Sequence, residues 1–219
     1  IDEASQIQPQ DCISTIARCS QAVIVGDPKQ MPPSNWLAAS MESESYETGD
    51  ETDAEDAESI LDLAINAFPV QRMLKWHYRS QHESLIAFSN SNWYGSNLVF
   101  FPAAVSESND LGIQYTFVPD AVNNDSNRNK EEAEKVVEYV IEHMRTSIKK
   151  DSIGIVAMNR NQQILIEDTL EKKLDEIDDN NVTAYLESFA DRDTEKYFVK
   201  NLENVQGDER DVVFISYTY

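Results

Sequence analysis

The sequence is poor in cysteine and in basic residues. Its 219 residues include only two cysteines and three histidines, and 18 lysines and arginines stand against 40 aspartates and glutamates. Cys12 and Cys19 are seven residues apart on an expected helix, a separation of about 10 Å, which is too long for a disulfide. We therefore expect two buried thiols in a reducing compartment. No group of histidines and cysteines has the spacing of a zinc site.

Long apolar runs are also absent. None approaches the roughly 18 to 20 residues that a membrane-spanning helix needs, and no signal peptide is visible. We expect a protein of the cytoplasm, or one associated with the nucleoid, that has no membrane partner.

The net charge is −22, whereas a protein that binds nucleic acid is expected to have a basic face. Nine acidic and no basic residues occur between Glu42 and Glu58, and without them the balance would still be −13. We interpret this acidic insertion, at about residues 40–58, as a solvated, mobile loop. The alternative is an electrostatic gate that mimics nucleic acid and blocks a groove.

The apolar pattern alternates between strands and helices. Three- and four-residue periodicity predicts helices, and short apolar runs predict strands. This order favours an α/β fold with parallel sheets that carry helices on both faces. The expected helices are 9–18, 60–65, 81–94, 129–149 and 162–174, and the expected strands are 1–5, 22–25, 72–76, 112–118, 153–157, 197–199 and 212–217.

Two polar segments follow two of the expected strands. Asp2 and Glu3 follow the apolar Ile1, and Gly26-Asp27-Pro28-Lys29-Gln30-Met31-Pro32-Pro33 follows the run at 22–25. A protein that hydrolyses a magnesium nucleotide places its metal carboxylate and its water-activating carboxylate beyond one strand, and its γ-phosphate sensor beyond the next.

These segments resemble motifs II and III of the superfamily 1 helicases, in the 5′-to-3′ branch that includes the helicase of nonsense-mediated decay. Residues 74–82, with a Tyr78-Arg79 core, resemble motif IV. Residues 204–211, followed by the apolar run 212–216, resemble motif V. The four motifs occur in the family's order and cover most of the chain.

The resemblance implies a RecA-like fold and ATP in the cleft between two domains. Residues 1–67 would be the C-terminal part of the first RecA-like domain. Residues 68–219 would be the second, truncated at its C-terminus. The sequence lacks a Gly-rich loop followed by Lys-Ser/Thr and the arginine-bearing motif VI. We therefore expect a piece of a larger protein that is inactive as an ATPase by itself.

The resemblance also assigns roles to residues of the first segments. Asp2 would hold Mg²⁺, which needs few protein carboxylates beside phosphate oxygens. Glu3 would polarise the attacking water. Gln30, whose amide both donates and accepts, would contact the γ-phosphate. The non-functional interpretation of the two acids is a helix N-terminus.

Five further positions complete the predicted sites. By resemblance, Arg79 is an arginine finger, and Glu209, beside Gln206 and Gly207, contacts the nucleotide ribose. Gly207 permits either a close backbone approach or a positive φ. Trp36, on a Pro-rich loop, is a candidate for stacking on a base.

Three functions remain open from the sequence. The first is an ATP-dependent helicase or translocase on single-stranded DNA or RNA, and the second is an ATP-dependent nucleic-acid clamp that does not unwind. The third is a metal-dependent nuclease that uses Asp2 and Glu3. The motifs indicate neither the oligomeric state nor the choice between DNA and RNA.

Overall fold

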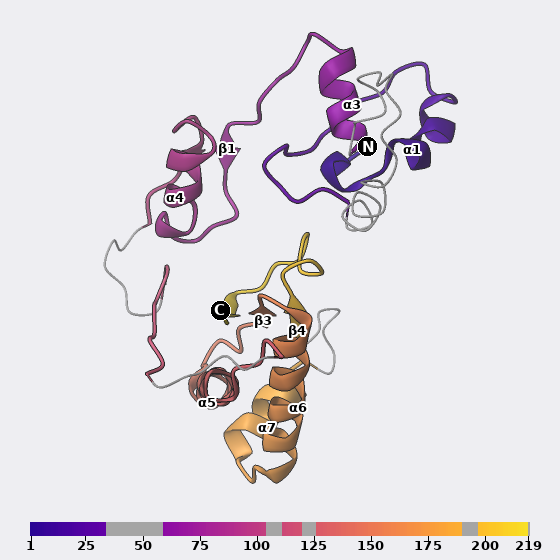
Figure 1. Ribbon diagram of the computed structural model, residues 1–219. Helices are drawn as coiled ribbons and strands as arrows, with labels where there is room; N and C mark the ends of the chain where they lie inside the picture. Colours follow the sequence, from indigo (N-terminus) through magenta and orange to yellow (C-terminus); the bar gives the residue numbers. More distant parts are fainter. Residues whose placement is uncertain (34–58, 104–110, 120–125, 190–196, 219) are drawn as a thin grey trace. The chain divides into compact units, whose positions relative to one another are not determined.

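The computed structural model describes residues 1–33, 59–103, 111–119, 126–189 and 197–218, which divide into two compact units (Figure 1). The first unit is Ile1–Tyr115 and the second is Thr116–Tyr219. Trp36 and the acidic insertion lie outside the described residues. The division between the compact units falls between Tyr115 and Thr116, and the domain boundary at residue 68 stays a prediction.

A small core holds the N-terminal part of the first unit together. The 3₁₀ helix η1 (Ala4–Gln6), α1 (Pro9–Ile16) and α3 (Ile60–Ala67) surround the buried side chains Ala4, Cys12, Ile60 and Leu61. Pro9 suits the first turn of α1, where its missing N–H leaves no hydrogen bond unmade. Ser59 and Asp62 form a reciprocal capping box that starts α3.

Three expectations fail in this part of the chain. The strand expected at 1–5 does not form, because Ala4–Gln6 are a 3₁₀ helix. Residues 22–25 are extended but not a buried strand, because Val23 is 65% exposed and, among the described residues, only the chain at Ile1–Ala4 bonds to this segment's backbone. Both cysteines are free, as expected. Cys12 is buried, whereas Cys19 is exposed because it lies beyond the last residue of α1.

A parallel β–α–β arrangement completes the first unit. Strand β1 (Trp76–His77) pairs with β2 (Val99–Phe100), and α4 (Ser84–Asn92) connects them. The side chain of Asn90 bonds to both the N–H and the C=O of Leu98 and so fixes the return to β2. The helix expected at 81–94 is confirmed in shorter form. The strand expected at 72–76 is present only from Trp76.

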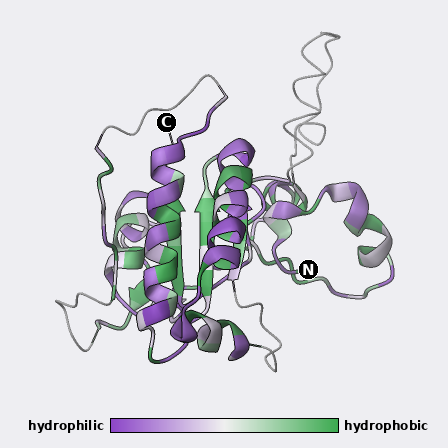
Figure 2. Ribbon diagram, turned by 90° about the horizontal axis from the view of Figure 1, so that it is seen from below, coloured by the Kyte–Doolittle hydropathy of each residue, from purple (hydrophilic) through white to green (hydrophobic). Residues whose placement is uncertain are grey.

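The second unit is built on a three-stranded parallel sheet with the order β4-β3-β5. Its strands are β3 (Ile153–Ala157), β4 (Tyr197–Asn201) and β5 (Val212–Ser216). Every residue of β3 is buried, as a central parallel strand requires. Figure 2 shows the strands as hydrophobic ribbons beside helices whose outer sides are hydrophilic.

Three helices pack on this sheet and share one core with it. They are α5 (Lys130–Thr146), α6 (Arg160–Glu176) and α7 (Asn180–Glu187), and each begins at a side-chain cap, Asn129, Asn159 or Asp179. The predicted fold class, α/β with parallel sheets and helices, is confirmed. The strand expected at 112–118 does not form: Ile113 and Tyr115 are 67% and 85% exposed, and no described strand lies beside them.

Two polar clusters lie at the two ends of the strands in the second sheet. Beyond the carboxyl end of β5, the fully buried Gln162 bonds to the backbone of Asn129 at both ends of its amide. Glu132 accepts hydrogen bonds from Ser216 and Thr218 there, at 2.7 and 3.1 Å.

No helix among the described residues is long and apolar enough to cross a membrane.

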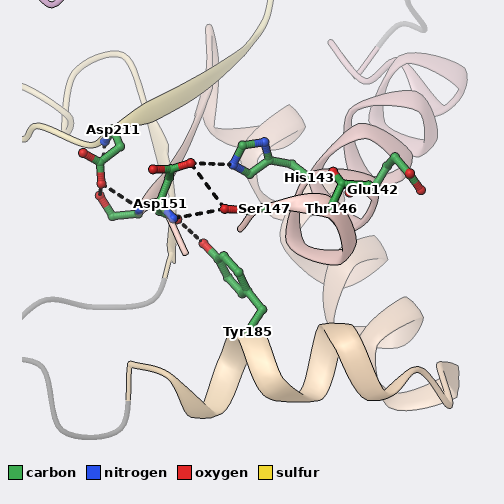
Figure 3. Close-up of polar contacts among 8 residues, drawn as sticks. Glu142, His143, Thr146, Ser147, Asp151, Tyr185 and Asp211 are labelled. Carbon is green, nitrogen blue, oxygen red and sulfur yellow. Dashed lines mark hydrogen bonds and ion pairs between the residues drawn. The ribbon is translucent and has the colours of Figure 1, made fainter. Parts of the chain in front are cut away.

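Asp151 is the centre of the second cluster, before β3. Figure 3 shows His143, Ser147 and Tyr185 gathered around it. The Tyr185 hydroxyl donates to the backbone carbonyl of Asp151 at 2.5 Å, and the Ser147 hydroxyl donates to its carboxylate at 3.3 Å. His143 Nε2 lies 3.8 Å from the same carboxylate. Burial lowers the pKa of His143 despite the opposing effect of Asp151.

The lowered pKa of His143 predicts acid destabilisation. The folded state takes up the proton at a lower pH than the unfolded state, so stability is full above about pH 6.5 and falls as the pH drops through the folded pKa. His143→Gln should lose less stability than the wild type between about pH 7 and about pH 5, measured by thermal unfolding. An NMR titration of the ring proton, assigned with the same variant, should give a midpoint below 6.5. A midpoint at or above that value would contradict the prediction.

Candidate nucleotide site

Two segments run side by side at the start of the first unit. The Ile1 amino group donates to the carbonyl of Val23, and the Ile1 carbonyl accepts from the N–H of Val25, both at 2.9 Å. This is the pattern of a parallel pair. The N–H of Ala4 then bonds to the carbonyl of Val25 at 2.9 Å. The pairing brings the Asp2-Glu3 segment and the loop that starts at Gly26 to the same end of the two paired segments.

Gly26 lies against the backbone of the first segment. A Cβ atom at this position would be 3.0 Å from the N atom of Ser5 and 3.1 Å from that of Ala4, and 3.0 Å from Cδ2 of Leu61. Neither backbone atom can move away without disturbing η1, so the close approach of the two segments requires glycine.

Glu3 has a left-handed backbone, with φ 50° and ψ 40°. Such a conformation is uncommon for a residue other than glycine and costs roughly 1–2 kcal/mol. Its N–H donates to Oδ1 of Asp2 at 3.0 Å, and both side chains are exposed. Strain of this kind concentrates at functional sites, because the surrounding structure must hold it in place.

The residues present fit a Mg²⁺ ion that arrives with nucleotide phosphates. Asp2 offers one exposed carboxylate, and Mg²⁺ keeps several waters and phosphate oxygens as its other ligands. Within the described ranges no group of three or more His, Cys, Asp or Glu side chains could hold a metal ion by protein ligands alone.

Asp27 organises the turn that carries Gln30. Its Oδ1 accepts from the N–H of Lys29 at 2.9 Å, and its carbonyl accepts from the N–H of Gln30 at 3.1 Å. Pro28 presets φ for the second position of such a turn. The other carboxylate oxygen, Oδ2, accepts from the hydroxyl of Tyr94 at 2.5 Å.

Arg79 is exposed in the loop after β1. His77 closes this loop: its Nε2 accepts from the N–H of Ser80 at 3.2 Å and lies 2.7 Å from the Ser80 hydroxyl. Burial, and then the charge of Arg79, lower the pKa of His77, so the ring remains an acceptor at neutral pH. The neutral ring therefore fixes the turn that presents Arg79.

The motif V residues belong to the second unit, between β4 and β5. Gly207 has φ 86° in a turn closed by the N–H of Asp208 and the carbonyl of Val205, at 3.0 Å. A Cβ there would meet no atom within 4 Å. Of the two reasons for a glycine left open by the sequence, the structure shows the positive φ. Glu209 is exposed, next to this turn.

The structure thus brings Asp2, Glu3 and the Gln30 turn to one edge, and it places Arg79 in the same unit. Gln206, Gly207 and Glu209 are in the other unit. Their catalytic and binding roles stay predictions. Tyr94, whose hydroxyl bonds to Asp27, is not among the residues that the sequence motifs identify. Its neighbour Trp93 is 51% exposed and packs against Phe88.

Parallel sheets with helices, as the two units show, are those of an α/β RecA-like fold. Residues 57–218 match the family described as "AAA domain", and the chain belongs to this family. The prediction of superfamily 1 helicase motifs is confirmed by the relatives as well.

Over its full length, the chain is 35% identical to "Uncharacterized ATP-dependent helicase MG140 homolog" of Mycoplasma pneumoniae and 34% identical to its counterpart in Mycoplasma genitalium. It spans 19% of the length of each. Over 80% of the chain, it is 29% identical to "Probable helicase senataxin" of Mus musculus and covers 7% of that protein.

The left-handed backbone of Glu3 predicts that glycine is more stable than alanine at this position, the reverse of the order in a helix. Glu3→Gly should be more stable than Glu3→Ala by roughly 1 kcal/mol, because only glycine adopts a positive φ without strain. At Glu131, an exposed residue in the first turn of α5, glycine should instead be less stable than alanine. Thermal unfolding of the four variants measures both differences, and the same order at both positions would refute the strain at Glu3.

Gly207 allows a similar test without any change in packing. Gly207→Ala should destabilise the second unit by about 1 kcal/mol through its backbone alone. Gly207→Asn should cost less, since asparagine tolerates the left-handed region. Urea unfolding of both variants checks the order, and an alanine variant as stable as the wild type would contradict it.

Proposed function

We propose that the protein is an ATP-dependent helicase or translocase that moves along single-stranded nucleic acid and hydrolyses ATP between two RecA-like domains. The observation that carries this proposal is the parallel pairing of Ile1 with Val23–Val25, which places the acidic pair and the Gln30 turn at one edge. The names of the relatives, all helicases, support it and do not favour the clamp or the nuclease.

Three residues of the first unit carry the proposed hydrolysis. Asp2 would hold a Mg²⁺ ion, which would supply positive charge against the nucleotide phosphates. Glu3 orients the attacking water toward the γ-phosphate and accepts a proton from that water. Gln30 contacts the γ-phosphate from a turn that Asp27 closes with two hydrogen bonds.

Arg79 and the motif V turn complete the proposed site. The Arg79 guanidinium neutralises charge that develops on the transferred phosphoryl group. Glu209 accepts a hydrogen bond from the nucleotide ribose, and Gln206 and Gly207 shape the turn beside it.

The proposed polymer is a single strand of DNA or RNA, and Trp36 is a candidate for stacking on its bases. The charge of −22 predicts that this chain alone binds the strand weakly. Because Cys12 and Cys19 are both free, we propose a reducing compartment, the cytoplasm or the nucleoid.

The test is ATP hydrolysis by the full-length protein, with and without a single-stranded polymer. Glu3→Gln should lower kcat by at least ~100-fold and leave the KM for ATP nearly unchanged, because the amide keeps the size of the side chain but cannot accept the proton. Glu131→Gln, a matched change at an exposed glutamate, should keep wild-type activity. Hydrolysis that responds neither to the strand nor to Glu3→Gln would refute the proposal.

A further inference from the structure

One hydrogen bond connects two segments that are 67 residues apart in the first unit. The phenol of Tyr94 donates to Oδ2 of Asp27 at 2.5 Å. Burial, followed by this hydrogen bond and the charge of Asp27, raises the pKa of Tyr94 to about 12. The phenol therefore remains protonated and able to donate throughout the physiological pH range.

We propose that Tyr94 is a positioning residue for ATP hydrolysis, which acts through Asp27 to hold the turn of Gln30 against the β–α–β segment that carries Arg79. This inference rests on the proposed function. Tyr94 touches no reacting atom in this scheme, and its effect passes through the carboxylate of Asp27.

Asp27 is suited to transmit a displacement because all of its oxygens are engaged. Oδ1 holds the N–H of Lys29, the carbonyl holds the N–H of Gln30, and Oδ2 holds Tyr94. The carboxylate is planar and rigid, so a shift at Oδ2 reorients Oδ1 and with it the turn. A hydrogen bond to a charged acceptor is also stronger than one between neutral groups.

Tyr94 is equally well connected to Arg79. It follows α4, and the carbonyl of Tyr94 accepts from the N–H and the side chain of Asn97, each at 3.0 Å. The chain then returns as β2, which pairs in parallel with β1, and Arg79 follows β1. The bond between Tyr94 and Asp27 therefore connects the turn of Gln30 to the β–α–β segment that carries Arg79.

A hollow lies beside the hydrogen bond between Tyr94 and Asp27. Lys29 and Tyr94, together with Ser89 and Trp93, line a hollow of about 200 Å³. Beside this hollow, the Tyr94 hydroxyl makes a directional contact between the turn and the segment that follows α4.

The experiment measures ATP hydrolysis by the full-length protein carrying Tyr94→Phe, which removes only the hydroxyl. The strand-stimulated kcat should fall roughly ten- to hundredfold, and the KM for ATP should change by less than about twofold, because binding contacts remain while positioning is lost. The melting temperature should stay near that of the wild type. Tyr115→Phe, at a tyrosine that is 85% exposed, is the matched control.

A double-mutant cycle separates coupling from an independent effect. Asp27→Ala combined with Tyr94→Phe should lose no more activity than Asp27→Ala alone, since the alanine already removes the acceptor of the Tyr94 hydroxyl. Losses that multiply, or a Tyr94→Phe enzyme with wild-type kcat, would overturn the inference while wild-type hydrolysis upholds the proposed function. A wild-type protein without ATP hydrolysis would overturn both.

Discussion

The close backbone pairing at the N-terminal edge of the first unit is the constraint on which the candidate site depends. Three hydrogen bonds of 2.9 Å align Ile1–Ala4 with Val23–Val25, and Gly26 allows the approach because it has no Cβ. The acidic pair, the strained backbone of Glu3 and the turn after Asp27 all follow from that alignment. Since the pairing uses main-chain atoms, the side chains beyond it remain available for chemistry.

The second unit is also built on parallel strands, but side-chain packing holds its sheet in place. Its central strand is wholly buried, so the sheet is held by packing against α5, α6 and α7. Polar groups collect at the two ends of the strands, where the ladder stops and main-chain and side-chain groups need new partners. Glu132, Gln162 and Ser216 provide them at one end, and Asp151 at the other.

Sequence patterns predicted what depends on local periodicity or on a specific motif. The long helix α5, the apolar strand β3 and the order of the four motifs are of this kind. The sequence patterns failed where the exposure of a side chain depends on distant partners. Val23 and Ile113 are residue types that are common in strands, but no described neighbour buries them. The left-handed Glu3 carries no signal either, because strain comes from the surrounding fold. Tyr94 was missed because its partner, Asp27, is 67 residues away.

The division into two compact units has a practical consequence for spectroscopy. All three tryptophans, Trp36, Trp76 and Trp93, fall within residues 1–115, and the second unit has none. Intrinsic tryptophan emission is therefore a natural reporter of the first unit alone, whereas the signal of the second unit must come from tyrosine or from its helices. Unfolding curves followed by emission and by circular dichroism would coincide only if the two units melt together.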